Sequence, residues 1–139
     1  MPTPLPAEVP PSRVQSVAIG PQRLRIAIRP GTNEAGHPPR PPFLLINGIG
    51  ARLEALEPFA AAVDPAVEVI RFDPPGVGGS PLPPGPYRFT GLVRLIARLP
   101  GAGGGRPQRR LHVYPGGHLG LITEAAALAP VVDGFLAAP

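Results

Sequence analysis

The residues best suited to chemistry lie in short loops that follow apolar stretches. One loop follows Phe43 to Ile46, a second opens at Asp73, and a third holds His118 within Pro-Gly-Gly-His-Leu. Ligands of open α/β sheets bind in the crevice beyond the carboxyl ends of the strands. If the apolar stretches are neighbouring strands, these loops form the candidate site.

The first loop consists of Asn47, Gly48, Ile49 and Gly50. Glycine lets backbone N–H groups approach a ligand oxygen closely, which favours an oxyanion hole that stabilises a developing negative charge. The alternative is a tight turn between a strand and a helix, with no ligand. The spacing of the residues fits both interpretations equally well.

The second loop, residues 73–80, is too rich in glycine and proline for regular secondary structure. Gly76 and Gly78 fit a phosphate-binding loop, but the chain has no lysine to complete a Walker motif. We therefore expect a stiff structural turn that ends at Ser80. In such a turn Asp73 accepts hydrogen bonds from the loop amides.

A makeshift catalytic triad of Ser80, His118 and Asp73 is a further, less favoured hypothesis. A nucleophilic serine needs a sharp turn that exposes its hydroxyl group, and neither Ser80 nor Asp73 lies on one. A loop histidine taken alone is more often solvated than catalytic. His118 therefore depends on its surroundings for any role.

Composition excludes several classes of function. The absence of cysteine rules out disulfides, thiolate catalysis and Cys-based zinc sites, and no metal or other cofactor is predicted. The net charge is +4, but the 13 arginines are scattered and no aromatic residues interleave with them, so nucleic acid is not an expected partner. No stretch approaches 18 apolar residues, and the N-terminus lacks the features of a signal peptide. We expect a cytoplasmic protein without a membrane span.

The 139 residues suit one domain. Prolines crowd the first part of the chain, so residues 1–12 are expected to be an unstructured lead and residues 13–139 a single domain. Apolar residues precede the Gly20-Pro21 pair, and Leu24, Ile26 and Ile28 after it alternate with residues 23, 25, 27 and 29, which predicts a β-hairpin that is polar on one face. Residues 100–108 form a Gly-rich junction.

The segment after the hairpin predicts a strand, a helix and a second strand. Phe43 to Ile46 is apolar on both faces, which is typical of a strand buried at the centre of a parallel sheet. Leucine, phenylalanine and valine recur at helical spacing over residues 53–63, and residues 68–72 return to strand-forming types. Further along the chain, residues 92–99 and 123–137 predict helices and residues 111–114 a short strand. The predicted fold class is α/β.

Residues 14–30 and three later stretches resemble the bacterial α/β-hydrolases known as poly(3-hydroxyalkanoate) depolymerases, which are serine esterases that act on storage polyester. The three later stretches read PFLLINGIGARLEALEPF, EVIRFDPPGVGGSPLPPGPYRFTGLVRLIARL and RRLHVYPGGHLGLITEAAALAPVVDGFL. The resemblance implies an α/β-hydrolase-like sheet and an ester or polyester substrate. It also implies that Asn47 to Gly50 correspond to the oxyanion loop and His118 to the base of the triad.

The chain departs from this family in its central part. It has no G-x-S-x-G nucleophile elbow, and no acidic residue lies between Ser80 and His118. Three missing strand–helix units would amount to roughly 100 residues. The resemblance thus implies a truncated, catalytically incomplete hydrolase. The alternatives are a non-enzymatic binding module that retains the crevice, and a gene-model fragment of a longer hydrolase.

Loss of the central part would leave Phe43 to Ile46 without one of its neighbouring strands. Unpaired buried N–H and C=O groups cost about 1–3 kcal/mol each, so this edge needs cover. We expect residues 111–114 to pair there and complete a five-stranded sheet. That arrangement would bring His118 close to Asn47 and Gly48.

Overall fold

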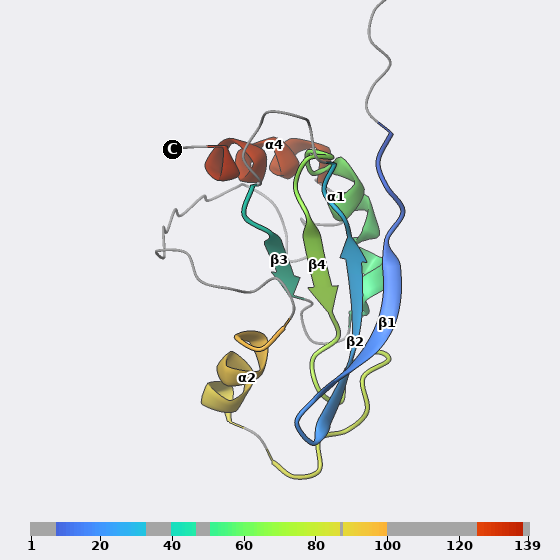
Figure 1. Ribbon diagram of the computed structural model, residues 1–139, viewed down its shortest axis with the longest axis vertical. Helices are drawn as coiled ribbons and strands as arrows, with labels where there is room; N and C mark the ends of the chain where they lie inside the picture. Colours follow the sequence, from blue (N-terminus) through green and yellow to red (C-terminus); the bar gives the residue numbers. More distant parts are fainter. Residues whose placement is uncertain (1–7, 33–39, 47–50, 87, 100–124, 138–139) are drawn as a thin grey trace, which may run out of the picture.

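The computed structural model describes residues 8–32, 40–46, 51–86, 88–99 and 125–137 (Figure 1). These residues form a mixed sheet with the strand order β1-β2-β4-β3, flanked by helices. The small α/β fold with an N-terminal antiparallel hairpin and a parallel pair is thereby confirmed. Its elements are β1 (Arg13–Ile19), β2 (Gln22–Arg29), β3 (Phe43–Ile46), the 3-10 helix η1 (Leu53–Leu56), α1 (Glu57–Ala62), β4 (Val69–Phe72), α2 (Phe89–Ile96) and α4 (Ala125–Leu136).

The hairpin of β1 and β2 turns through two residues, Gly20 and Pro21, because Ile19 lies opposite Gln22. Gly20 has a φ of +60°, whereas the proline ring holds its own φ near −65°. This combination fits a type II′ turn, which matches the twist of the two strands. The expected hairpin is thus present.

The sequence predicts a hairpin that is polar on one face, but in the structure part of that face is buried. On β2, Arg23 is exposed, but Ala27 and Arg29 are only 0% and 1% exposed. The reason is that α1 lies over this end of the strand, and the Arg29 guanidinium group donates to carbonyl oxygens of α1 and the turn after it. Both faces of β2 are therefore covered at the end of the strand that holds Ala27 and Arg29.

The segment from β3 through α1 to β4 forms a parallel strand pair joined by a helix, as expected. Phe43 lies opposite Val69, and Ile46 lies opposite Phe72. Among the described strands β4 is interior and fully buried, whereas β3 is last in the order and Ile46 is 42% exposed. The predicted central position of β3 thus differs from the described order. Residues 111–114, the predicted fifth strand, lie outside the described residues.

Two apolar clusters cover the two faces of the sheet. Helices α1 and α4 pack over one face, on residues that include Leu45 and Val69. Residues of α2, together with Leu99, pack over the other face, where Leu24 and Phe72 lie. None of the described helices is long and apolar enough to cross a membrane.

Candidate functional site

The candidate site lies at the edge of the sheet where β3 and β4 end. The two strands run in the same direction, so the chain leaves both at one edge (Figure 1). Asn47, Gly48, Ile49, Gly50 and His118 all lie outside the described residues. The part of the edge that the structure describes is the loop of residues 73–80 and the elements that contact it.

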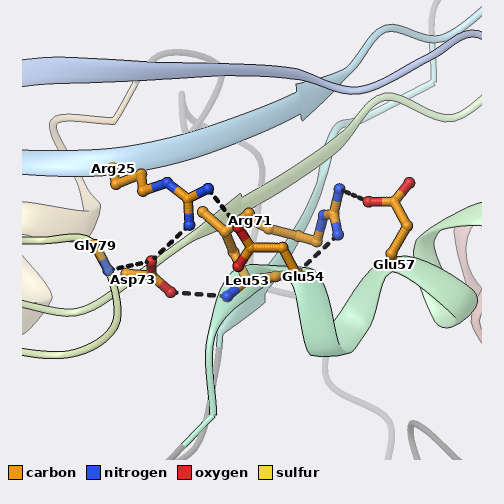
Figure 2. A network of polar contacts seen from close by, with 7 residues as sticks. All are labelled: Arg25, Leu53, Glu54, Glu57, Arg71, Asp73 and Gly79. Carbon is orange, nitrogen blue, oxygen red and sulfur yellow. Dashed lines mark hydrogen bonds and ion pairs between the residues drawn. The ribbon is translucent and has the colours of Figure 1, made fainter.

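The buried carboxylate of Asp73 is the centre of this part (Figure 2). Its Oδ1 accepts a hydrogen bond from the Leu53 backbone N–H at 2.8 Å, and its Oδ2 accepts one from the Gly79 N–H at 2.9 Å. The Arg25 guanidinium group lies 3.5 Å from Oδ2. Asp73 therefore ties β2, the start of η1 and the glycine loop to one point.

The glycine loop fits closely around this carboxylate. A Cβ atom on Gly78 would lie 2.5 Å from the Asp73 carboxylate, and the φ of Gly78 is +56°. Gly76 also has a positive φ, of +77°, and its N–H donates to the Pro81 carbonyl oxygen at 2.9 Å. Both glycines are thus needed for the shape of the loop, and Gly78 also for the close approach to Asp73.

Ser80 is held by main-chain groups. Its hydroxyl group donates to the Asp73 carbonyl oxygen at 2.6 Å and accepts a hydrogen bond from the Arg25 N–H at 2.9 Å. The residue is only 5% exposed. Ser80 therefore closes the loop, and its hydroxyl group is not presented to the crevice as a nucleophile.

Two ion pairs fix the start of the helical segment that follows residues 47–50. Arg25 pairs with Glu54, and the hydrogen bond from Arg25 lowers the pKa of Glu54 to about 2. Arg71 is fully buried and pairs with Glu57 (Figure 2). It also donates to the Leu53 carbonyl oxygen at 2.9 Å. The exit of the predicted oxyanion loop is thereby anchored to β2 and β4.

A second buried arginine, Arg29, stabilises the opposite end of α1. Its guanidinium group donates to four carbonyl oxygens at 2.5–2.8 Å, those of Ala60, Val63, Asp64 and Val67. Burial lowers the pKa of Arg29, since desolvation disfavours the charged form. These contacts complement the negative end of the helix dipole, and they lie away from the candidate site.

An apolar cavity of about 270 Å³ opens beside the glycine loop. It lies between the proline-rich segment that follows the loop and helix α2. Its lining residues are Gln22, Pro75, Pro83, Pro84, Gly85, Pro86, Gly91, Leu92 and Leu95. The sequence shows the prolines of this segment, but nothing in it indicates a cavity.

The structure brings Asp73, Gly76, Gly78 and Ser80 together in one buried loop, and it adds partners that the sequence analysis missed. The main addition is Arg25, which contacts both Asp73 and Glu54. Within the described part of the chain, no group of three or more His, Asp or Glu side chains could hold a metal ion. The described contacts hold β2, η1 and the loop of residues 73–80 together. Among the described residues they include no exposed pair of nucleophile and base.

No protein-family model matches the chain, and no solved structure matches it significantly. The chain is 51% identical over 85 residues to the poly(3-hydroxyalkanoate) depolymerase of Ectopseudomonas oleovorans. That alignment covers 61% of this chain but only 28% of the depolymerase. The chain therefore matches little more than a quarter of that protein, and the similarity supports a hydrolase-related family.

Proposed function

We propose that the chain is a hydrolase-related domain of the poly(3-hydroxyalkanoate) depolymerase type whose serine mechanism is incomplete. The 51% identity over 85 residues supports the relationship. The positions and hydrogen bonds of the serines are the main support for the proposal that the serine mechanism is incomplete. The chain has three serines, Ser12, Ser16 and Ser80, and each lies within the described residues.

Within the described residues, each of the three serines contacts backbone groups or an arginine, and none lies on a G-x-S-x-G turn. Ser80 is buried between backbone groups. Ser12 accepts a hydrogen bond from Arg71 at 2.8 Å, and Ser16 lies on β1 and accepts one from Arg23 at 3.4 Å. Loss of a triad serine costs about a million-fold in rate in a comparable hydrolase, so ester turnover near background is expected.

A binding role is the second candidate function, and the cavity beside α2 favours it. A domain that keeps the scaffold of a polyester hydrolase and an apolar cavity can bind an ester without cleaving it. Under this alternative the loops at the crevice edge hold a ligand or a partner. Affinity for an ester, with no cleavage of it, is the property that separates this role from catalysis.

The test uses the purified chain with p-nitrophenyl butyrate and octanoate, together with a fluorophosphonate reagent that labels activated serines. We expect turnover equal to that of buffer with heat-denatured protein, and no added mass on intact-mass spectrometry. His118→Ala serves as the matched variant and should behave like the parent chain. Stoichiometric labelling of one serine, with turnover that His118→Ala abolishes, would show that the chain is a competent serine esterase.

A further inference from the structure

The cavity beside α2 has the composition of a site for an uncharged ligand. Among the described residues that line it, Gln22 has the only polar side chain and none has an ionisable one. Leu92 and Leu95 of α2 form one wall, and prolines of the segment 83–86 form another. A charged ligand would lose its hydration at such a surface without gaining a partner.

The segment that carries the proline wall is anchored to the rest of the fold at its start, Pro81. The Pro81 carbonyl oxygen accepts from the Gly76 N–H at 2.9 Å and from the Gln22 side-chain amide at 3.3 Å. Proline rings also remove backbone freedom, because they fix φ. The anchor at Pro81 and the proline rings therefore restrict the conformations of this wall, which lowers the free energy that a ligand would lose in ordering it.

The side chain of Gln22 supplies one directional contact. Its amide NH₂ group donates to the carbonyl oxygens of Arg23, at 2.9 Å, and of Pro81. This orientation assigns the side-chain oxygen as an acceptor, and no described residue donates to it. Gln22 is 7% exposed, so water reaches this residue little. A ligand hydroxyl group is the complementary donor.

We propose that this cavity binds the alkyl chain of an uncharged hydroxy ester, with the ligand hydroxyl group donating to the side-chain oxygen of Gln22. The cavity volume of about 270 Å³ lies just below the roughly 300–1,000 Å³ of typical small-molecule pockets. That is enough for one alkyl chain of several carbons and less than most drug-sized pockets enclose. The identity of the ligand as a 3-hydroxyalkanoate ester rests on the proposed function.

The test is a displacement assay with the neutral fluorophore N-phenyl-1-naphthylamine, whose emission rises in apolar sites. Methyl 3-hydroxyoctanoate and methyl octanoate are the competitors, since they differ only in the hydroxyl group. One hydrogen bond to Gln22 should make the hydroxy ester displace the probe at about three- to tenfold lower concentration. Gln22→Met should abolish that preference while methyl octanoate still competes.

Two variants of α2 test whether the probe occupies this cavity. Leu95→Trp fills the cavity and should weaken probe binding at least tenfold. Val93→Trp is the control, because Val93 is 49% exposed on the same helix and does not line the cavity. Far-UV circular dichroism confirms that each variant is folded.

The outcomes separate the two proposals. Equal probe binding by Leu95→Trp and Val93→Trp, or no binding by the parent chain, would overturn the cavity site without affecting the serine assays. Probe binding that Leu95→Trp blocks, but that the hydroxy ester displaces no better than methyl octanoate, would overturn the hydroxy-ester assignment. A different result, ester turnover that depends on a serine, would refute the proposed function.

Discussion

Asp73→Asn is the substitution that most directly tests the network at the candidate site. Each carboxylate oxygen of Asp73 accepts a hydrogen bond from a backbone N–H, that of Leu53 on one side and that of Gly79 on the other. An asparagine has one oxygen and one NH₂ group in the same space. Rotation of the amide cannot relieve the mismatch, because a donor faces it in both orientations.

The size of the effect follows from which N–H loses its acceptor. Leu53 is only 1% exposed, so the amide oxygen should stay with its N–H and the NH₂ group should face Gly79. Position 73 is 0% exposed, so the new NH₂ group would be a buried donor without an acceptor, which costs about 1–3 kcal/mol. The weakened contact with Arg25, which is 3.5 Å long and partly exposed, adds at most ~1 kcal/mol. We expect a loss of ~2–3 kcal/mol in the free energy of unfolding.

Urea unfolding followed by circular dichroism at 222 nm measures this loss, since the chain contains no tryptophan. Glu54→Gln is the matched control: it weakens another pair of the same Arg25, but the Glu54 side chain is 56% exposed. The control should lose less than ~1 kcal/mol. An Asp73→Asn protein within ~0.5 kcal/mol of the parent, or a control with an equal loss, would refute the central role of Asp73.

Three further substitutions have defined outcomes in the same unfolding assay. Gly78→Ala should lose ~2–4 kcal/mol, because its Cβ would meet Asp73 at 2.5 Å with φ at +56°; Gly85→Ala, with nothing within 4 Å, should lose under ~1 kcal/mol, and equal losses would contradict the steric argument. Arg29→Lys should lose ~2–4 kcal/mol, since three ammonium donors replace a fork that reaches four carbonyl oxygens; an unchanged midpoint would contradict this. Burial raises the pKa of Asp133 above its ordinary 3.8. The free energy of unfolding therefore falls as the pH rises and this carboxyl group ionises in the folded protein. Asp133→Asn should therefore be more stable than the parent at pH 7, with no advantage below about pH 3.5; an advantage that persists there would point to a cause other than ionisation.

Elements set by local pattern could be predicted from the sequence. The hairpin follows from the alternation over β2 and the Gly20-Pro21 pair, and both signals lie within a few residues of the turn. The segment from β3 to β4 follows from the change of apolar period from strand to helix and back. In each case neighbouring residues carry the information, so tertiary packing does not override it.

The position of the buried arginines could not be predicted in the same way. Arg29 ends an alternating strand and has the pattern of an exposed side chain, yet its partners lie 31–38 residues away. The burial of Arg71 is easier to predict from its neighbours in the sequence. It lies between Ile70 and Phe72 in a strand that is buried throughout, so its side chain had to enter the interior on the opposite face. Its partner Glu57 comes from a different element.

The candidate site shows the same division. That Asp73 would contact its own loop follows from the turn chemistry of aspartate, and the bond to Gly79 is of that kind. The contact to Leu53 spans 20 residues and depends on the position of η1, and the contact to Arg25 spans 48 residues and depends on the pairing of β2 with β4. A search for local motifs finds the first type of contact, and only the strand order reveals the second.

The polar groups of Asp73 and Ser80 already make the hydrogen bonds that hold the loop of residues 73–80 in place. Using either residue for catalysis would therefore destabilise the fold. Recruiting Ser80 as a nucleophile would break its bonds to the Asp73 carbonyl oxygen and the Arg25 N–H. Recruiting the Asp73 carboxylate would release the start of η1 and the glycine loop together. Each bond contributes about 1 kcal/mol and each orphaned buried partner costs more, so either change would consume much of a small domain's stability of roughly 5–15 kcal/mol. A serine introduced at a new position, on a turn of its own, would leave these described contacts in place, so we expect it to cost the fold less stability than recruiting Ser80.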